Sequence, residues 1–145
     1  MTTSESIIDL DYAALAEFRY QIRRFLHFSE LAARTSGMEP QQHQLLLAIQ
    51  GLAHSGEQPT VGLLAERLQL QHHSASELVD RLVERGSVSR LRAPSDRRQV
   101  LIQLTPRGAA ELERLTEYHL AELRTNGPAL VSALETVLRT THGCE

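Results

Sequence analysis

The stretch HHSASELVDRLVERGSVSRLRAPSDRRQVLIQLTP, residues 72–106, decides the fold. It begins with apolar residues at helical spacing, and this predicted helix ends at Gly86, a natural C-cap. Apolar and polar residues then alternate on both sides of PSDR, which predicts two strands joined by a tight turn. Thr105 and Pro106 predict the next helix, because a capping side chain precedes a proline at the first helical position.

Three helices are predicted before this stretch. The first runs from about Asp11 to Ala33, with apolar residues at steps of three and four. Pro40 can begin the second helix, QQHQLLLAIQGL, and Thr60 can cap a short third helix, VGLLAERL. A short helix, a tight turn, a second helix and a basic hairpin together form a winged helix-turn-helix pattern.

Two further helices are predicted after the hairpin. The first begins at Pro106 and is broken at Asn126-Gly127-Pro128, and the second runs from about Pro128 to Thr140. The expected fold is mainly α with a small β-hairpin. The winged helix-turn-helix domain, residues 56–105, is expected between N-terminal helices in residues 1–55 and C-terminal helices in residues 106–145.

The composition excludes several classes of protein. The 145 residues are 41% apolar, enough for one domain with a core, and the single cysteine, Cys144, rules out an intrachain disulfide. The start of the sequence does not resemble a signal peptide, and no apolar run suits a membrane span, so we expect a cytoplasmic protein. The sequence lacks GxSxG, a Gly-rich phosphate loop and paired catalytic carboxylates, so we expect no enzyme and no cofactor.

Charge is distributed unevenly along the chain. The formal net charge is −3, and all fifteen basic residues are arginine. Residues 81–107 hold seven arginines against two acids, a local charge of +5, which leaves −8 elsewhere. Arginine suits bidentate contacts with phosphate and guanine, so this segment favours nucleic acid. The alternative is an ordinary solvated face.

Small and hydrogen-bonding residues begin the helix before Gly86. A recognition helix needs such residues where it approaches base edges. We expect His72, His73, Ser74 and Ser76 to contact bases or phosphates, and Arg81 to reach a phosphate. An ordinary surface helix that begins with Ser and His is the alternative.

The segment LAERLQLQHHSASELVDRLVERGSVSRLRAPSDRRQVLIQLTPRG resembles the core of the MarR family of bacterial transcription regulators. DRRQVLIQLT, residues 96–105, is similar to the family's wing motif, and LVDRLVERG to the end of its recognition helix. EPQQHQLLLAI resembles the family's second helix. The resemblance covers about residues 11–139. It implies a homodimer formed by the first and the two C-terminal helices, which binds a pseudo-palindromic double-stranded DNA operator, and in most cases a repressor released by a small organic ligand.

The resemblance also suggests roles for individual residues. Asp96 would brace the wing turn, Arg98 would enter the minor groove and Arg97 would contact phosphate; a solvated turn is the alternative. Ligands of the family would lie around four residues of this chain, namely His27, Phe28, His43 and Leu47.

Glu77 departs from the family, which often has a basic or polar residue there. Its carboxylate can accept a hydrogen bond from a cytosine amino group, or it can face inward and pair with Arg81, its i+4 neighbour. The second arrangement is the one that we expect.

Two rival functions remain open. Some zinc-responsive members of the family have a histidine at the position that matches His43, and His119 and Glu30 are further candidate ligands, with Glu39 nearby. No HxxxH or HxH spacing supports this interpretation, so no metal site is expected. Cys144 lacks the setting of a redox sensor. The other rival is a winged helix that binds a protein partner and has lost DNA binding.

Overall fold

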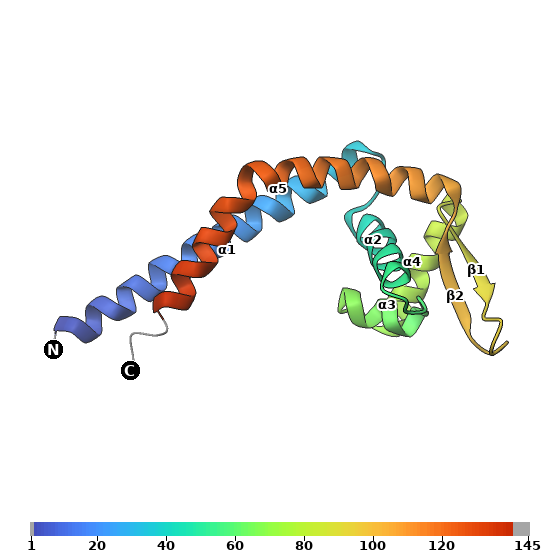
Figure 1. The fold of residues 1–145 in the computed structure, drawn as a ribbon, viewed down its shortest axis with the longest axis horizontal. Helices are drawn as coiled ribbons and strands as arrows, with labels where there is room; N and C mark the ends of the chain where they lie inside the picture. Colours follow the sequence, from blue (N-terminus) through green and yellow to red (C-terminus); the bar gives the residue numbers. More distant parts are fainter. Residues whose placement is uncertain (1, 141–145) are drawn as a thin grey trace. The chain divides into compact units, whose positions relative to one another are not determined.

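The computed structural model describes residues 2–140 (Figure 1). Its elements are α1 (Thr2–Thr35), α2 (Pro40–His54), α3 (Val61–Leu68), α4 (His72–Arg85), β1 (Val88–Arg92), β2 (Val100–Leu104) and α5 (Pro106–Thr140). The predicted class, mainly α with a small hairpin, is confirmed. Residues 32–116 form one compact unit, and the described parts of residues 1–31 and 117–145 form a second. None of the described helices has the length and apolar character needed to span a membrane.

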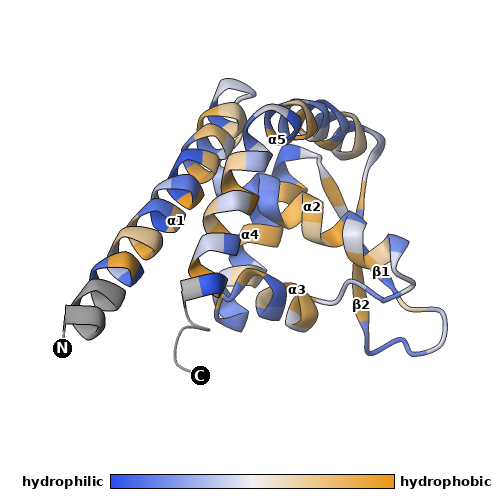
Figure 2. Cartoon of the chain, turned by 60° about the vertical axis from the view of Figure 1, so that its left-hand side comes forward, coloured by the Kyte–Doolittle hydropathy of each residue, from blue (hydrophilic) through white to orange (hydrophobic). Residues whose placement is uncertain are grey.

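The unit of residues 32–116 is built around one apolar core. The core is shared by α2, α3, α4, the hairpin and the start of α5, and Figure 2 shows apolar residues along α2 and α4. Leu45, Leu46 and Ile49 of α2 are fully buried, and each such side chain stabilises the fold by about 1.5–3 kcal/mol. The core therefore fixes where α4 lies relative to α2 and α3.

The turn between α3 and α4 is short because one residue adopts a left-handed conformation. Thr60 caps α3, and its Oγ1 accepts a hydrogen bond from Leu63 N at 3.2 Å, as the sequence predicts. Gln69 ends α3 at φ 55°, and its Nε2 donates to the carbonyl of Glu66 at 2.8 Å. Gly86 ends α4 at φ 83°, which an L side chain rarely adopts, so the predicted C-cap is confirmed.

The hairpin is antiparallel, with Val88 opposite Leu104 and Arg92 opposite Val100. Ile102 N donates to Pro59 O at 2.8 Å, so the segment before α3 lies beside β2. The predicted tight turn at PSDR is wrong, because seven residues, 93–99, connect the strands. Gln99 N donates to Asp96 O at 3.0 Å, which places the hydrogen-bonded turn at residues 96–99, two residues later than expected.

In the second unit, α1 and α5 lie side by side and antiparallel. Ser29 Oγ lies 2.7 Å from His119 Nε2, and Ala14 lines the same cavity as Ala133, further along both helices. Several large apolar side chains of these helices remain exposed. They are Leu10, Tyr12, Leu15, Tyr20, Leu26, Leu31, Tyr118, Leu120, Leu123, Val131, Leu134 and Leu138.

Two predicted helix boundaries are wrong. α1 begins at Thr2 rather than near Asp11, and α5 continues through Asn126-Gly127-Pro128 as a single helix. Asn126 Nδ2 donates to Glu122 Oε1 at 2.6 Å, one helical turn earlier, instead of forming a turn. Pro128 removes one backbone hydrogen bond, but the helix continues to Thr140, and Ala133 beyond the proline is buried.

Candidate nucleic-acid interface

α4 has a buried face and an exposed face. Its buried side chains are Ala75, Leu78, Val79 and Leu82. The predicted recognition residues lie outside this face: His72, His73 and Arg81 are exposed, and Ser74 and Ser76 are partly buried. The core therefore holds α4 by one side and leaves the other side open to a partner, as a recognition helix requires.

The expectation that Glu77 faces inward and pairs with Arg81 is wrong. Both residues are exposed. Within the described part of the chain, the Glu77 carboxylate has neither a hydrogen bond nor an ion pair. An exposed pair on one helix contributes only about 0.3–0.5 kcal/mol, which is too little to hold two long side chains in one arrangement.

The wing tip presents two adjacent arginines on a braced turn. Asp96 Oδ1 accepts a hydrogen bond from Arg98 N at 3.0 Å, and Arg92 Nη1 donates to Arg97 O at 2.8 Å. These bonds use the backbone of Arg97 and Arg98 and leave both exposed guanidinium groups without a partner among the described residues. The turn is thus held by its main chain while two cations face solvent.

The seven arginines of residues 81–107, which we call the basic segment, fall into two groups. Four of them bind within the same unit: Arg85, Arg90, Arg92 and Arg107. Arg90, for example, forms an ion pair and hydrogen bond with Asp80 of α4. The guanidinium groups of the other three contact no other described residue: Arg81, Arg97 and Arg98. The unpartnered group contains the three arginines that the sequence predicts to contact DNA.

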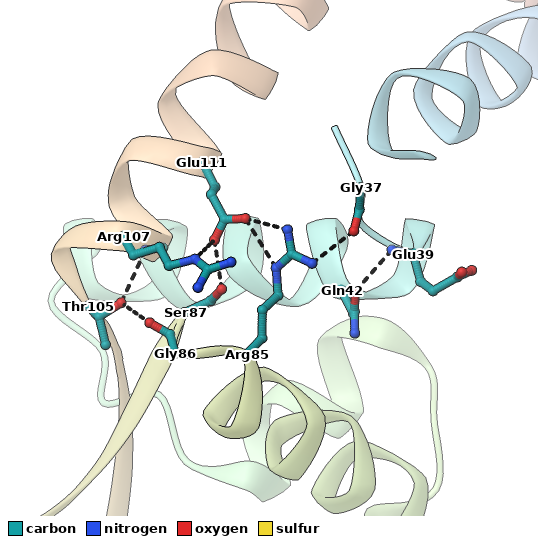
Figure 3. A network of polar contacts seen from close by, with 10 residues as sticks. Gly37, Glu39, Gln42, Arg85, Gly86, Ser87, Thr105, Arg107 and Glu111 are labelled. Atoms are coloured by element: carbon teal, nitrogen blue, oxygen red, sulfur yellow. Dashed lines mark hydrogen bonds and ion pairs between the residues drawn. The ribbon is translucent and has the colours of Figure 1, made fainter. Parts of the chain in front are cut away.

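A polar cluster, which we name the Glu111 junction, joins the end of α4 to the start of α5 (Figure 3). Its members are Gly37, Arg85, Ser87, Arg107 and Glu111. Arg85 donates to Glu111 Oε2 from Nε at 3.1 Å and from Nη2 at 2.6 Å, and its Nη1 donates to Gly37 O at 2.8 Å. Ser87 Oγ donates to Glu111 Oε1 at 2.7 Å, and Arg107 Nε lies 3.7 Å from the same oxygen.

The junction keeps the Glu111 carboxylate ionised. Burial of its side chain, 10% exposed, raises the pKa, but the hydrogen bonds from Arg85 and Ser87 and the charges of Arg85 and Arg107 outweigh this effect. The net pKa of Glu111 is therefore lowered. A buried carboxylate held by two charge-assisted hydrogen bonds from one guanidinium fixes the end of α4 firmly.

Backbone contacts strengthen the same connection. Thr105 Oγ1 donates to Gly86 O at 2.6 Å and accepts from Gly108 N at 3.1 Å, so the residue that ends the hairpin also caps α5. A Cβ on Gly108 would lie 2.0 Å from Ser87 O. Glycine is therefore required where α5 crosses the residue after α4.

The residues suggested for a small ligand lie in both units. In the unit of α1, His27 is exposed and Phe28 is partly buried. In the other unit, His43 is buried in α2, whereas Leu47 is 49% exposed. The ring of Phe28 contacts His119 edge-on, at 5.4 Å between centroids.

The described residues contain no group of three or more His, Cys, Asp or Glu side chains that could hold a metal ion. His119 instead pairs with Ser29 and packs against Phe25 and Phe28. Glu30, the other weak candidate, is partly buried in α1. Cys144 lies outside the described residues.

Sequence reasoning missed the Glu111 junction. The charge distribution along the sequence indicates one charged surface, although Arg85 and Arg107 bind a carboxylate. The sequence holds one signal of this junction. Glu111 lies four residues before Leu115 and therefore on the apolar side of a predicted helix, where an acid needs a partner.

Comparisons with known proteins agree with this geometry. Residues 36–99 match the model of the MarR family. An uncharacterized HTH-type transcriptional regulator of Bacillus subtilis, YcgE, is 32% identical over 102 residues, which are 70% of this chain and 64% of that protein. The chain thus spans less than two thirds of this curated relative.

Solved structures of Escherichia coli MarR are also similar. The wild-type apo form is 26% identical, with a TM-score of 0.65 over 86% of this chain and 92% of that one. A cysteine-to-serine variant of the same protein with operator DNA is 24% identical, with a TM-score of 0.64 over 86% of this chain and 89% of that one, and at this identity shows the fold alone. The match of the family model, together with these similarities, shows that the chain belongs to the MarR family.

Proposed function

We propose that this protein is a transcription regulator that binds double-stranded DNA. In this proposal α4 enters the major groove, and the wing tip lies against the adjacent backbone and minor groove. One observation carries the proposal: Arg97 and Arg98 have exposed guanidinium groups that contact no other described residue, on a turn whose backbone is already hydrogen-bonded. Such a turn offers cations at little further cost in conformational entropy.

The proposed regulator is a homodimer that reads a pseudo-palindromic operator. The exposed apolar side chains of α1 and α5 support this part, because large exposed apolar surfaces usually contact a partner. Val131 and Leu138, for example, are 55% and 53% exposed. Sedimentation equilibrium should give twice the mass of the 16.2 kDa chain, and Leu138→Glu should shift the protein towards the monomer.

We further propose that a small organic ligand releases the regulator from DNA. This part rests on the resemblance to the MarR family. A ligand lowers DNA affinity only if it binds better to the DNA-incompetent form, so it must also bind less well when DNA is present. Variants at His27, Phe28, His43 and Leu47 test separately which of these positions affects ligand affinity.

The first experiment is a duplex titration. DNA from upstream of the protein's own gene is compared with a composition-matched scramble at two salt concentrations. A regulator should prefer its own sequence by at least about a hundredfold and lose affinity as salt rises. Equal weak binding to both duplexes, with and without zinc, would instead support a module that binds a protein partner.

A further inference from the structure

The exposed face of α4 is acidic, which is unexpected for a helix that approaches DNA. At 100° per residue, the side opposite Ala75, Val79 and Leu82 carries His73, Glu77, Asp80 and Glu84. All four are exposed. This composition needs an explanation, because a carboxylate near phosphates weakens binding.

The acid at position 80 is explained by a contact within the protein. Its carboxylate pairs with Arg90 of β1 and so connects α4 to the hairpin. Glu77 differs, because among the described residues it has no partner, and Arg81 one turn later does not bind it. Glu77 also lies in the N-terminal half of α4, the part of a recognition helix that contacts base edges.

A carboxylate can gain affinity in the major groove only by accepting hydrogen bonds. Cytosine presents an N4 amino donor there, beside a C5–H that does not repel the second carboxylate oxygen. Adenine also presents an amino donor, but the neighbouring N7 acceptor repels a carboxylate. Guanine and thymine present acceptors at this edge, so they would repel it too.

We propose that Glu77 selects a C·G base pair at one position of each half-site by accepting a hydrogen bond from cytosine N4. This inference rests on the proposed DNA-binding function. Arg81, exposed on the next turn, supplies a cation that offsets part of the repulsion between Glu77 and the phosphates. Glu77 is then a specificity determinant whose main effect is to reject other bases.

The test is a selection from a pool of randomised duplexes with wild type, Glu77→Gln and Glu84→Gln. The two variants form a matched pair, because each removes one negative charge from the same exposed face of α4 without changing side-chain size. Glutamine also suits adenine, since it can donate to N7 and accept from N6.

Wild type should select cytosine at one position of each half-site by about tenfold or more. Glu77→Gln should lose that preference, or replace it with adenine, and keep the other positions. Glu84→Gln should select the wild-type sequence, with affinity raised equally for all duplexes.

Two different failures can be told apart. If Glu77→Gln behaves like Glu84→Gln, with the wild-type sequence and a uniform gain in affinity, the inference is wrong and the proposed function stands. If wild type enriches no sequence from the pool, the proposed function fails and the inference fails with it.

Discussion

The wing tip and the Glu111 junction draw their arginines from the same basic segment, but the two regions use them in opposite ways. Arg85 is half-buried and donates to a carboxylate and a carbonyl. Arg97 and Arg98 keep their guanidinium groups in solvent, on a turn whose backbone is hydrogen-bonded to the side chains of Arg92 and Asp96. Local charge therefore does not show which arginines are available to a partner; the carboxylates and carbonyls within reach of each guanidinium group do.

The largest effect is expected from Gly108→Ala, which breaks the junction at the backbone. The new Cβ would lie 2.0 Å from Ser87 O, so α5 or the end of α4 must move. We expect a loss of about 3 kcal/mol or more in the free energy of unfolding, measured with urea.

Gly127→Ala is the control for this change, since its nearest contact would be Leu123 Cβ at 3.8 Å. It should leave stability unchanged or raise it by up to about 1 kcal/mol. Equal losses in both variants would mean that the contact between α5 and Ser87 is not what matters at Gly108.

A smaller loss is expected from Glu111→Gln, which removes the charge at the centre of the junction. Arg85, whose side chain is 22% exposed, would lose its ionic partner. We expect a loss of about 2 kcal/mol in the free energy of unfolding, somewhat less than for a fully buried ion pair.

Glu113→Gln, at an exposed position of the same helix, should change stability by less than about 0.5 kcal/mol. An unfolding curve of Glu111→Gln that coincides with that of Glu113→Gln would show that the junction does not stabilise the unit.

Arg98→Ala should change DNA binding rather than stability, because the guanidinium group of Arg98 contacts no other described residue and alanine keeps the backbone N–H that Asp96 accepts. The unfolding free energy should stay within about 0.5 kcal/mol of wild type. Affinity for the operator should fall about tenfold, equivalent to about 1.4 kcal/mol. Arg97→Ala should lower the slope of log affinity against log salt by about 1 per protomer.

Arg114→Ala serves as the control for charge, because Arg114 is exposed on α5, outside α4 and the wing. If this variant weakens operator binding as much as Arg98→Ala does, net charge rather than the wing determines affinity.

The smallest effect is a pH dependence of the junction. The pKa of Glu111 is lowered from its usual 4.5, so the folded state binds a proton less readily than the unfolded state. Its contribution to stability is therefore fully present above 4.5 and is lost as the pH falls through the lower, folded-state pKa. The difference in unfolding free energy between wild type and Glu111→Gln should shrink over this range. A difference that stays constant with pH would contradict the assignment.

The sequence predicts the parts of this fold that depend on local chemistry. Thr60, Gly86 and Thr105 each act at the helix boundary that the sequence predicts, because caps and left-handed residues are local requirements. The wrong predictions concern competition between local and tertiary effects. Pro128 is a helix breaker by local rules, but α5 continues through it to Thr140, and Ala133 beyond it is buried.

The features of the candidate site also divide into those that the local sequence predicts and those that it does not. The exposure of His73, Arg97 and Arg98 follows from their positions in a helix and a turn. The pairing of Glu111 with Arg85, 26 residues away, and the lack of an inward partner for Glu77 depend on three-dimensional distances that no local pattern contains.

The hairpin has one end that Thr105 fixes and a tip loop whose length is free to vary. The hydrogen bonds of Thr105 to Gly86 and Gly108 set where β2 stops and where α5 begins. One residue inserted between Ile102 and Thr105 would shift the strand register and turn the following side chains to the other face of the hairpin, which would move Thr105 away from Gly86 and Glu111 away from Arg85. Insertions in the tip loop, residues 93–99, change only how far the wing extends. The wing can therefore be lengthened or shortened while the rest of the unit stays the same.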